Sequence, residues 1–221
     1  DQARYLEAVI SAESGPVRVA SIYLPNGNPA PGPKYDYKLA WMERLRRHAK
    51  GLLKFEEPLI LAGDYNCIPR DSDCWDPAVW ADDALALPET RAAFRALKWL
   101  GFTEAFEQVD GRGHQYTFYD YQAGRWQKGH GIRIDHLLCS PQAADRLEGV
   151  EIHTKTRGRE KASDHIPIVG TFRVTGTKSS RGETKHQRSF YNWKCPDTKS
   201  YNQNIKSSFE SRDYLNNIND L

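Results

Sequence analysis

Three short apolar segments of this sequence carry polar residues where a buried strand would run or end. Asp64 and Asn66 follow the run LILAG, Asp135 interrupts the run IRIDHLL, and Asp164 and His165 precede the run IPIVGTF. A carboxylate within or just beyond a buried strand is costly unless it is paired or bound to a cation. Taken alone, Asp64 is equally well explained as a turn former or loop cap, and Asp164 with His165 is better explained as a surface turn. This alternative is weaker for Asp135, because the interior of a strand contains no turn. The three segments together predict one polar site at the ends of core strands.

The surrounding sequence alternates strand and helix patterns. The helix expected over residues 36–54 places Trp41, Leu45 and Leu52 on one face. Further helices are predicted over residues 89–100 and 141–147. Strands are predicted over residues 4–11, 17–24, 58–62, 116–121, 132–139, 150–156 and 166–174. Strands and helices in this order predict a layered α/β or α+β domain.

Composition divides the chain near residue 175. Residues 1–175 are rich in Ala, Val and Leu, whereas residues 176–221 contain no Ala or Val and many Ser, Asn and Lys. A segment this polar buries too little apolar surface to offset its ordering entropy. We therefore expect one folded domain over residues 1–175 and a disordered tail over residues 176–221.

Mean hydropathy, cysteine spacing and net charge restrict the environment and the binding partners that we expect for this protein. Mean hydropathy is −0.72, and no apolar run approaches the roughly 20 residues of a membrane-spanning helix, so we expect no membrane partner. The four cysteines show neither CxxC nor metal-type spacing, which favours a reducing cytoplasm over a disulfide framework. We also expect a monomer. Net charge is +2, and the tail holds eight Lys or Arg against five Asp or Glu. Any nucleic-acid binding by the body must therefore use local positive charge.

The polar residue types favour metal-assisted phosphoester hydrolysis. A hard divalent cation prefers carboxylate and amide oxygens as ligands. Hydrolysis of a phosphoester needs charge neutralisation and an in-line water, and a histidine near neutrality stabilises charge in the transition state. The sequence contains no Gly-rich phosphate loop.

Between about residues 4 and 174, the three polar segments and three others follow a known order and spacing. The others are IYLPNG at 22–27, GFTEAF at 101–106 and YTFYDY at 116–121. In these motifs the chain resembles the endonuclease/exonuclease/phosphatase superfamily, and within it the exodeoxyribonuclease III type (Xth type) of AP endonuclease. The resemblance implies a deoxyribonuclease I-like, four-layer α/β sandwich.

The resemblance also implies catalytic roles for five residues: Tyr23, Asp64, Asn66, Asp135 and His165. Tyr23 would contact the scissile phosphate, and Asn66 would hold it. Asp64 would handle either the attacking water or the leaving oxygen. Asp135 would hydrogen-bond to His165 and select its tautomer, and His165 would stabilise the pentacovalent phosphorus.

Cofactor and DNA contacts are implied in the same way. Mg²⁺, with Mn²⁺ as the alternative, would be held by Asp64, Asn66, Asp164 and His165. Phe118 would pack into an abasic gap or, equally, be a core aromatic. In the loop 122–131, Arg125, Trp126 and Lys128 would bind DNA, although Trp126 is also consistent with covering the sheet. Lys34, Lys38 and residues 157–161 are further candidates for phosphate contacts.

Two family motifs have no counterpart in this sequence: an N-terminal strand with a metal-site Asn, and a Gln-Glu strand. We therefore expect an N-terminally incomplete member that lacks the N-terminal strands of the fold. The implied activity is Mg²⁺-dependent 3′-to-5′ hydrolysis of double-stranded DNA to 5′-mononucleotides, with incision at abasic sites. The alternatives are an inactive remnant that at most binds DNA, and a phosphatase acting on lipid or inositol phosphates.

Overall fold

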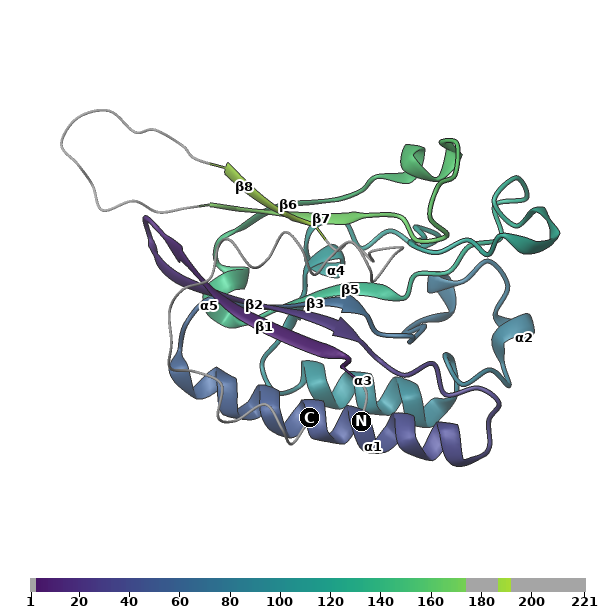
Figure 1. Ribbon diagram of the computed structural model, residues 1–221, viewed down its shortest axis with the longest axis horizontal. Helices are drawn as coiled ribbons and strands as arrows, with labels where there is room; N and C mark the ends of the chain where they lie inside the picture. Colours follow the sequence, from purple (N-terminus) through teal and green to yellow (C-terminus); the bar gives the residue numbers. More distant parts are fainter. Residues whose placement is uncertain (1–2, 174–186, 192–221) are drawn as a thin grey trace.

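A five-stranded mixed sheet forms the centre of the molecule in the computed structural model, which describes residues 3–173 and 187–191 (Figure 1). The strand order is β1-β2-β3-β5-β4, and all neighbours are antiparallel except β2 and β3. The strands are β1 (Tyr5–Ala12), β2 (Gly15–Tyr23), β3 (Leu59–Asp64), β4 (Thr103–Glu104) and β5 (Asp135–Cys139). A second, antiparallel sheet has the order β6-β7-β8, formed by β6 (Leu147–Ile152), β7 (Ile168–Arg173) and β8 (Gln187–Tyr191).

Two long helices, α1 (Pro33–Leu52) and α3 (Pro88–Lys98), lie along one face of the central sheet, and the second sheet lies on the other side (Figure 1). Shorter helices lie in the connections: α2 (Pro77–Trp80), α4 (Ala105–Val109) and α5 (Pro141–Ala144). Single 3₁₀ turns are η1 (Leu53–Phe55), η2 (Asp71–Asp73), η3 (Gln122–Gly124) and η4 (Thr154–Gly158). The described residues thus build three layers of the predicted sandwich, and the α/β class is confirmed.

Strand β3 is buried along its whole length because both of its faces are covered. Leu59 and Leu61 point toward the helices and pack with Trp41 and Phe94. Ile60 and Ala62 point the other way, into the core between the sheets. This alternation separates the two cores and determines which face of the sheet each later residue of the strand presents.

Two predicted strands are wrong in part. Residues 116–121 form no strand, because Phe118 makes only isolated bridges to Ile132 and to His165. The strand predicted over residues 132–139 begins only at Asp135. The N–H groups of Ile134 and Asp135 both donate to the hydroxyl of Thr117, at 3.1 Å. Residues 132–134 are therefore bound to loops, and Asp135 starts β5 instead of interrupting it.

Three smaller differences concern helix α5, strand β6 and strand β8. Helix α5 ends at Ala144, three residues earlier than predicted, and β6 spans residues 147–152 instead of 150–156. Strand β8 lies within the predicted tail and pairs with β7. Residues 174–186 and 192–221 lie outside the described residues, so the domain boundary near residue 175 stays a prediction.

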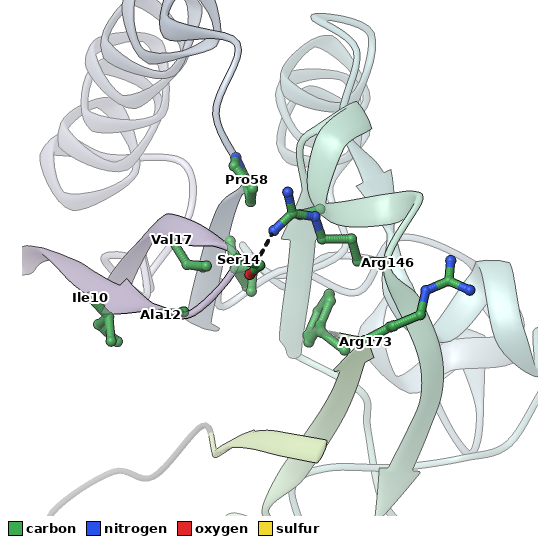
Figure 2. Close-up of a pocket in the computed structure, with 10 residues that line it drawn as sticks. Ile10, Ala12, Ser14, Val17, Pro58, Arg146 and Arg173 are labelled. Atoms are coloured by element: carbon green, nitrogen blue, oxygen red, sulfur yellow. Dashed lines mark hydrogen bonds between the residues drawn. The ribbon is translucent and has the colours of Figure 1, made fainter. Parts of the chain in front are cut away.

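A small apolar cavity of about 30 Å³ lies where the β1–β2 hairpin meets the end of β7 (Figure 2). Ile10, Val17, Ile60 and Phe172 contribute to its lining, and Arg146 donates a 3.4 Å hydrogen bond to Ser14 across it. With so small a volume and no carboxylate or histidine in its lining, it is a packing gap between the sheets.

None of the helices in the described part of the chain combines the length and the apolar character needed to cross a membrane.

Candidate active site

Three of the predicted catalytic residues lie in one row across the central sheet. In the strand register, Tyr23 of β2 pairs with Asp64 of β3, and Asp64 pairs with Asp135 of β5. Residues opposite one another in a sheet present their side chains to the same face. Ala62 and Leu137, two residues from Asp64 and Asp135, belong to the core between the sheets. The row therefore faces the second sheet, where His165 precedes β7.

A polar cavity of about 320 Å³ opens at this end of the strands. Four of the five predicted catalytic residues line it, and Asp135 lies behind His165. The lining consists of Tyr23, Asn26, Asn28, Asp64, Asn66, Trp80, Asp83, Leu85, Phe118, Asp120, Ile132, Ile134, Asp164 and His165. The cavity thus joins residues from segments separated by more than 140 positions of sequence.

The predicted hydrogen bond between Asp135 and His165 is present. His165 Nδ1 lies 2.9 Å from Oδ2 and 3.1 Å from Oδ1 of Asp135, whose side chain is buried. The opposite ring nitrogen, Nε2, lies 3.9 Å from Asp64 Oδ2. A carboxylate at Nδ1 holds a proton there and orients the ring. Nε2 is then the nitrogen directed at the Asp64 side of the site.

The Asp64 carboxylate is held by Asn66. The N–H of Asn66 donates to Asp64 Oδ1 at 2.8 Å, and its side-chain amide donates to Asp64 Oδ2 at 3.3 Å and to Leu24 O at 2.8 Å. The amide oxygen of Asn66 accepts a 3.1 Å hydrogen bond from Asn26. Asn66 has a φ of 43°, a left-handed conformation that asparagine tolerates better than most residues. The turn after β3 therefore orients the carboxylate that ends it.

A buried lysine lies directly behind this turn. Lys38 of α1 is 0% exposed and donates three hydrogen bonds to backbone carbonyl groups, those of Asn26 (3.0 Å), Asn66 (2.7 Å) and Ala84 (3.0 Å). Burial lowers the pKa of its ammonium to about 8, against smaller opposing effects of nearby acidic groups. The prediction that Lys38 contacts DNA phosphates is wrong, because its ammonium group does not reach the surface.

The other side of the cavity is apolar. The ring of Phe118 packs edge-on against His165, with centroids 5.0 Å apart. Ile132, Ile134 and Leu85 complete this wall. Phe118 also contacts the small core around Ile132, so it is both a lining residue and a packing residue, and its role toward DNA stays a prediction.

The remaining predicted DNA-binding residues do not line the cavity. The guanidinium group of Arg125 lies 5.6 Å from the ring centre of Trp75, and Trp126 packs edge-on against Tyr119 at 4.9 Å. Trp126 thus packs in a small cluster with Tyr116 and Ile166, and coverage of the sheet by Trp126 stays a prediction. Lys128 is exposed on the same loop. Contacts of Arg125, Trp126 and Lys128 with DNA stay predictions.

The predicted metal ligands lie around one cavity but do not form a complete set. Within residues 3–173 and 187–191, no group of three or more His, Cys, Asp or Glu side chains is placed to hold a metal ion. Asn66 uses both ends of its side-chain amide in the contacts with Asn26, Leu24 and Asp64. The residues described here do not fit a complete Mg²⁺ site, so no catalytic step is derived through a metal.

Several lining residues were not predicted from the sequence. Asn28 donates to both carboxylate oxygens of Asp83, at 3.1 and 3.2 Å, and this pair brings the loop after α2 to the cavity. Asn26 lies in the family motif IYLPNG, where no role was predicted for it, and Asn28 directly follows that motif. Asp83 and Asp120 follow no apolar strand, so the pattern that identified Asp64 does not apply to them.

Known exodeoxyribonucleases are similar to this chain in sequence. Exodeoxyribonuclease III of Haemophilus influenzae is 28% identical over 180 residues, which are 78% of this chain and 67% of that protein. An exodeoxyribonuclease of Bacillus subtilis is 30% identical over 162 residues, which are 72% of this chain and 62% of that protein. The chain spans between 57% and 67% of the length of the curated relatives compared here.

Solved structures of nucleic-acid enzymes superpose on this chain. The 3′ phosphatase NExo from Neisseria, bound to a product DNA hairpin, superposes with a TM-score of 0.73 at 35% identity, over 77% of this chain and 65% of that one. An AP endonuclease from Archaeoglobus fulgidus superposes with a TM-score of 0.68 at 32% identity, over 71% and 61% of the two chains. These neighbours confirm the predicted deoxyribonuclease I-like fold. The sequence profile of the endonuclease/exonuclease/phosphatase family matches residues 4–165, and the chain belongs to that family.

Proposed function

We propose that this chain is a DNA-repair phosphodiesterase that hydrolyses double-stranded DNA from 3′ ends, releasing 5′-mononucleotides, and incises DNA at abasic sites. The observation that carries the proposal is the array of Asp135, His165 and Asp64 beside a polar cavity. The relatives support the substrate class, because their names describe nucleases, an AP endonuclease and a DNA 3′ phosphatase.

The positions of the side chains in the site suggest a separate catalytic role for each. Asp135 holds the Nδ1 proton of His165, and Nε2 of the imidazolium donates to a phosphoryl oxygen, where negative charge develops in the transition state. Asp64, oriented by Asn66, accepts a proton from the attacking water as a carboxylate or, when it carries a proton, donates that proton to the leaving oxygen. Tyr23 lies in the same row and is 43% exposed, so its hydroxyl is accessible to a phosphate.

Divalent-cation dependence is a separate part of the proposal. It is supported by the family resemblance and not by a complete ligand set among the described residues, and EDTA tests it directly. We expect cleavage in Mg²⁺ or Mn²⁺ and none after chelation, with activity recovered when the cation is restored.

The decisive experiment compares the chain with its Asp64→Asn variant on a labelled duplex that carries one abasic-site analogue, in Mg²⁺. We expect incision by the wild type and a loss of at least about 100-fold in the variant, because the substitution removes the charge and keeps the shape. A duplex with a recessed 3′ end measures the exonuclease activity in parallel.

Two outcomes would contradict the proposal. If a folded wild-type chain cleaves neither duplex, the inactive-remnant alternative is favoured. If it releases phosphate from an inositol phosphate faster than it cleaves DNA, the lipid or inositol phosphatase alternative is favoured.

A further inference from the structure

The ammonium group of Lys38 joins three segments that are distant in sequence. Its three acceptors are the carbonyl groups of Asn26 after β2, Asn66 after β3, and Ala84 between α2 and α3. All three segments line the cavity, through Asn26, Asn66 and the neighbours of Ala84. One side chain from α1 therefore fixes the backbone on one side of the candidate active site.

Two of these acceptors belong to the residues that orient Asp64. The side-chain amide of Asn26 donates to Asn66, and Asn66 donates to both oxygens of the Asp64 carboxylate. Lys38 holds the backbone of both asparagines. Hydrogen bonds on either side of these two asparagines thus connect the Lys38 ammonium with the carboxylate that lies 3.9 Å from His165 Nε2.

The loop after β2 is shaped around the lysine. Gly27 has a φ of 92°, and a Cβ at this position would lie 2.6 Å from Cδ of Lys38 and 3.2 Å from Cβ of Ala84. The third acceptor is also held from two other sides, because Ala84 O accepts from the Thr90 hydroxyl at 2.7 Å and Ala84 N donates to Asn28 at 3.1 Å. The slot between these loops fits the aliphatic stem of a lysine and the ammonium at its end.

Core stability alone does not explain a lysine here. Burial of an ammonium group carries a desolvation cost that a methionine of similar length avoids. Three hydrogen bonds offset this cost, but they also hold three carbonyl groups at fixed positions. The fixed positions matter for a reaction in which a displacement of about 1 Å costs on the order of 100-fold in rate.

We propose that Lys38 is a positioning residue of the active site, whose ammonium group holds the Asn26, Asn66 and Ala84 segments so that Asp64 faces His165. The proposal rests on the proposed function for its kinetic part. It assigns to Lys38 an effect on turnover without contact with substrate.

The test compares Lys38→Met with Lys50→Met, which changes an exposed lysine in the last turn of the same helix. For Lys38→Met, with near-native circular dichroism, we expect kcat to fall at least tenfold and KM for duplex DNA to change less than about threefold, because the ammonium contacts no phosphate. Lys50→Met should leave both values unchanged.

Chemical rescue separates positioning from packing. In a background in which the four native cysteines are replaced by Ala, alkylation of unfolded Lys38→Cys with 2-bromoethylamine, followed by refolding, restores an ammonium group at nearly the original reach. The control is the same background with Lys38 retained, treated in the same way. We expect most of the lost kcat to return. If Lys38→Met does not fold, the refolded Lys38→Cys protein replaces it and is measured with and without alkylation, with the same loss and recovery of kcat expected.

A readout without catalysis keeps this proposal distinct from the proposed function. In spectra of ¹⁵N-asparagine-labelled protein, the side-chain amide signals of Asn26 and Asn66 should shift in Lys38→Met, return after rescue, and stay in place in Lys50→Met. An inactive wild type with these shifts overturns the proposed function and leaves the positioning by Lys38 standing. Unchanged kcat in an active, folded Lys38→Met, or unchanged amide signals, overturns the role of Lys38.

Discussion

His165 is placed by contacts on three sides. Asp135 accepts from Nδ1 at 2.9 Å, Phe118 packs edge-on against the ring, and the hydroxyl of Ser163 accepts from the His165 backbone N–H at 3.1 Å. The ring therefore has little freedom to turn, and the nitrogen that faces Asp64 is determined by the nitrogen that Asp135 holds. In the proposed function, Asp135 therefore acts through His165 and does not touch substrate.

Replacement of Asp135 by Asn tests that role. The amide has nearly the same shape but no negative charge, so the imidazole loses the partner that selects its tautomer. We expect kcat to fall by about 10²- to 10⁴-fold, with less than about a threefold change in affinity for uncleaved duplex. Steady-state kinetics and fluorescence anisotropy measure the two quantities. A loss of affinity that parallels the loss of turnover would mean that Asp135 contacts DNA.

Strands β4 and β5 and helix α4 are connected by buried ion pairs on the side of the sheet away from the cavity. Arg133, which precedes β5, is 0% exposed and contacts Glu104 of β4 at 3.2 Å and Asp73 of η2 at 3.0 Å. Burial raises the pKa of Glu104, but the charge of Arg133 and a contact with His136 outweigh it and lower the pKa to about 2. The carboxylate is therefore more acidic in the folded chain than in the unfolded chain.

This difference predicts how stability depends on pH. Glu104 stabilises the fold above its ordinary pKa of 4.5, and the contribution is lost as pH falls from 4.5 toward 2. We expect Glu104→Gln to lower the unfolding free energy at pH 7 by about 3 kcal/mol, because Arg133 loses a charged partner. The difference between wild type and variant should shrink as pH falls to 3 in urea unfolding series. The exposed Glu160→Gln is the control, and a difference that is constant with pH would contradict the assignment.

Among the described residues, charge is divided between an acidic cavity and basic loops. The cavity lining that they form contains four aspartates, at positions 64, 83, 120 and 164, and no Lys or Arg. Under the proposed function, the positive charge that attracts DNA therefore lies outside the cavity. Two described loops carry such charge: residues 122–131, and residues 154–161, in which Arg157 lies 4.9 Å from the ring centre of Tyr121. The hydroxyl of Tyr121 donates to Ala162 O at 3.0 Å and ties the two loops together.

Salt dependence measures the contribution of the first loop. The logarithm of a DNA-binding constant falls with the logarithm of salt concentration by about 0.9 for each phosphate contacted. We expect Arg125→Ala with Lys128→Ala to reduce this slope by about 1 to 2 between about 50 and 200 mM salt, measured by anisotropy in EDTA. Lys54→Ala, which changes an exposed lysine in η1, should leave the slope unchanged. An equal slope in the double variant would mean that this loop does not contact the DNA backbone.

The local pattern of apolar and polar residues in the sequence predicted much of the secondary structure of this protein. Helices α1 and α3 and strands β1 to β3 were predicted, because burial of one face produces a periodic pattern of apolar residues. Asp64 and Asp135 stood out because a carboxylate beside or within an apolar strand is costly unless it is paired. The roles of these residues and of His165 were implied by the family resemblance.

Only the tertiary structure decided which of these residues meet, and what the others do. The row of Tyr23, Asp64 and Asp135 depends on strand register, and the strand expected over residues 116–121 failed because no continuous partner faces it. Lys38, read as a surface cation, is buried against carbonyl groups 12, 28 and 46 positions away. Backbone carbonyl groups have no sequence signature, since every residue carries one. A contact made to them is determined by the fold alone.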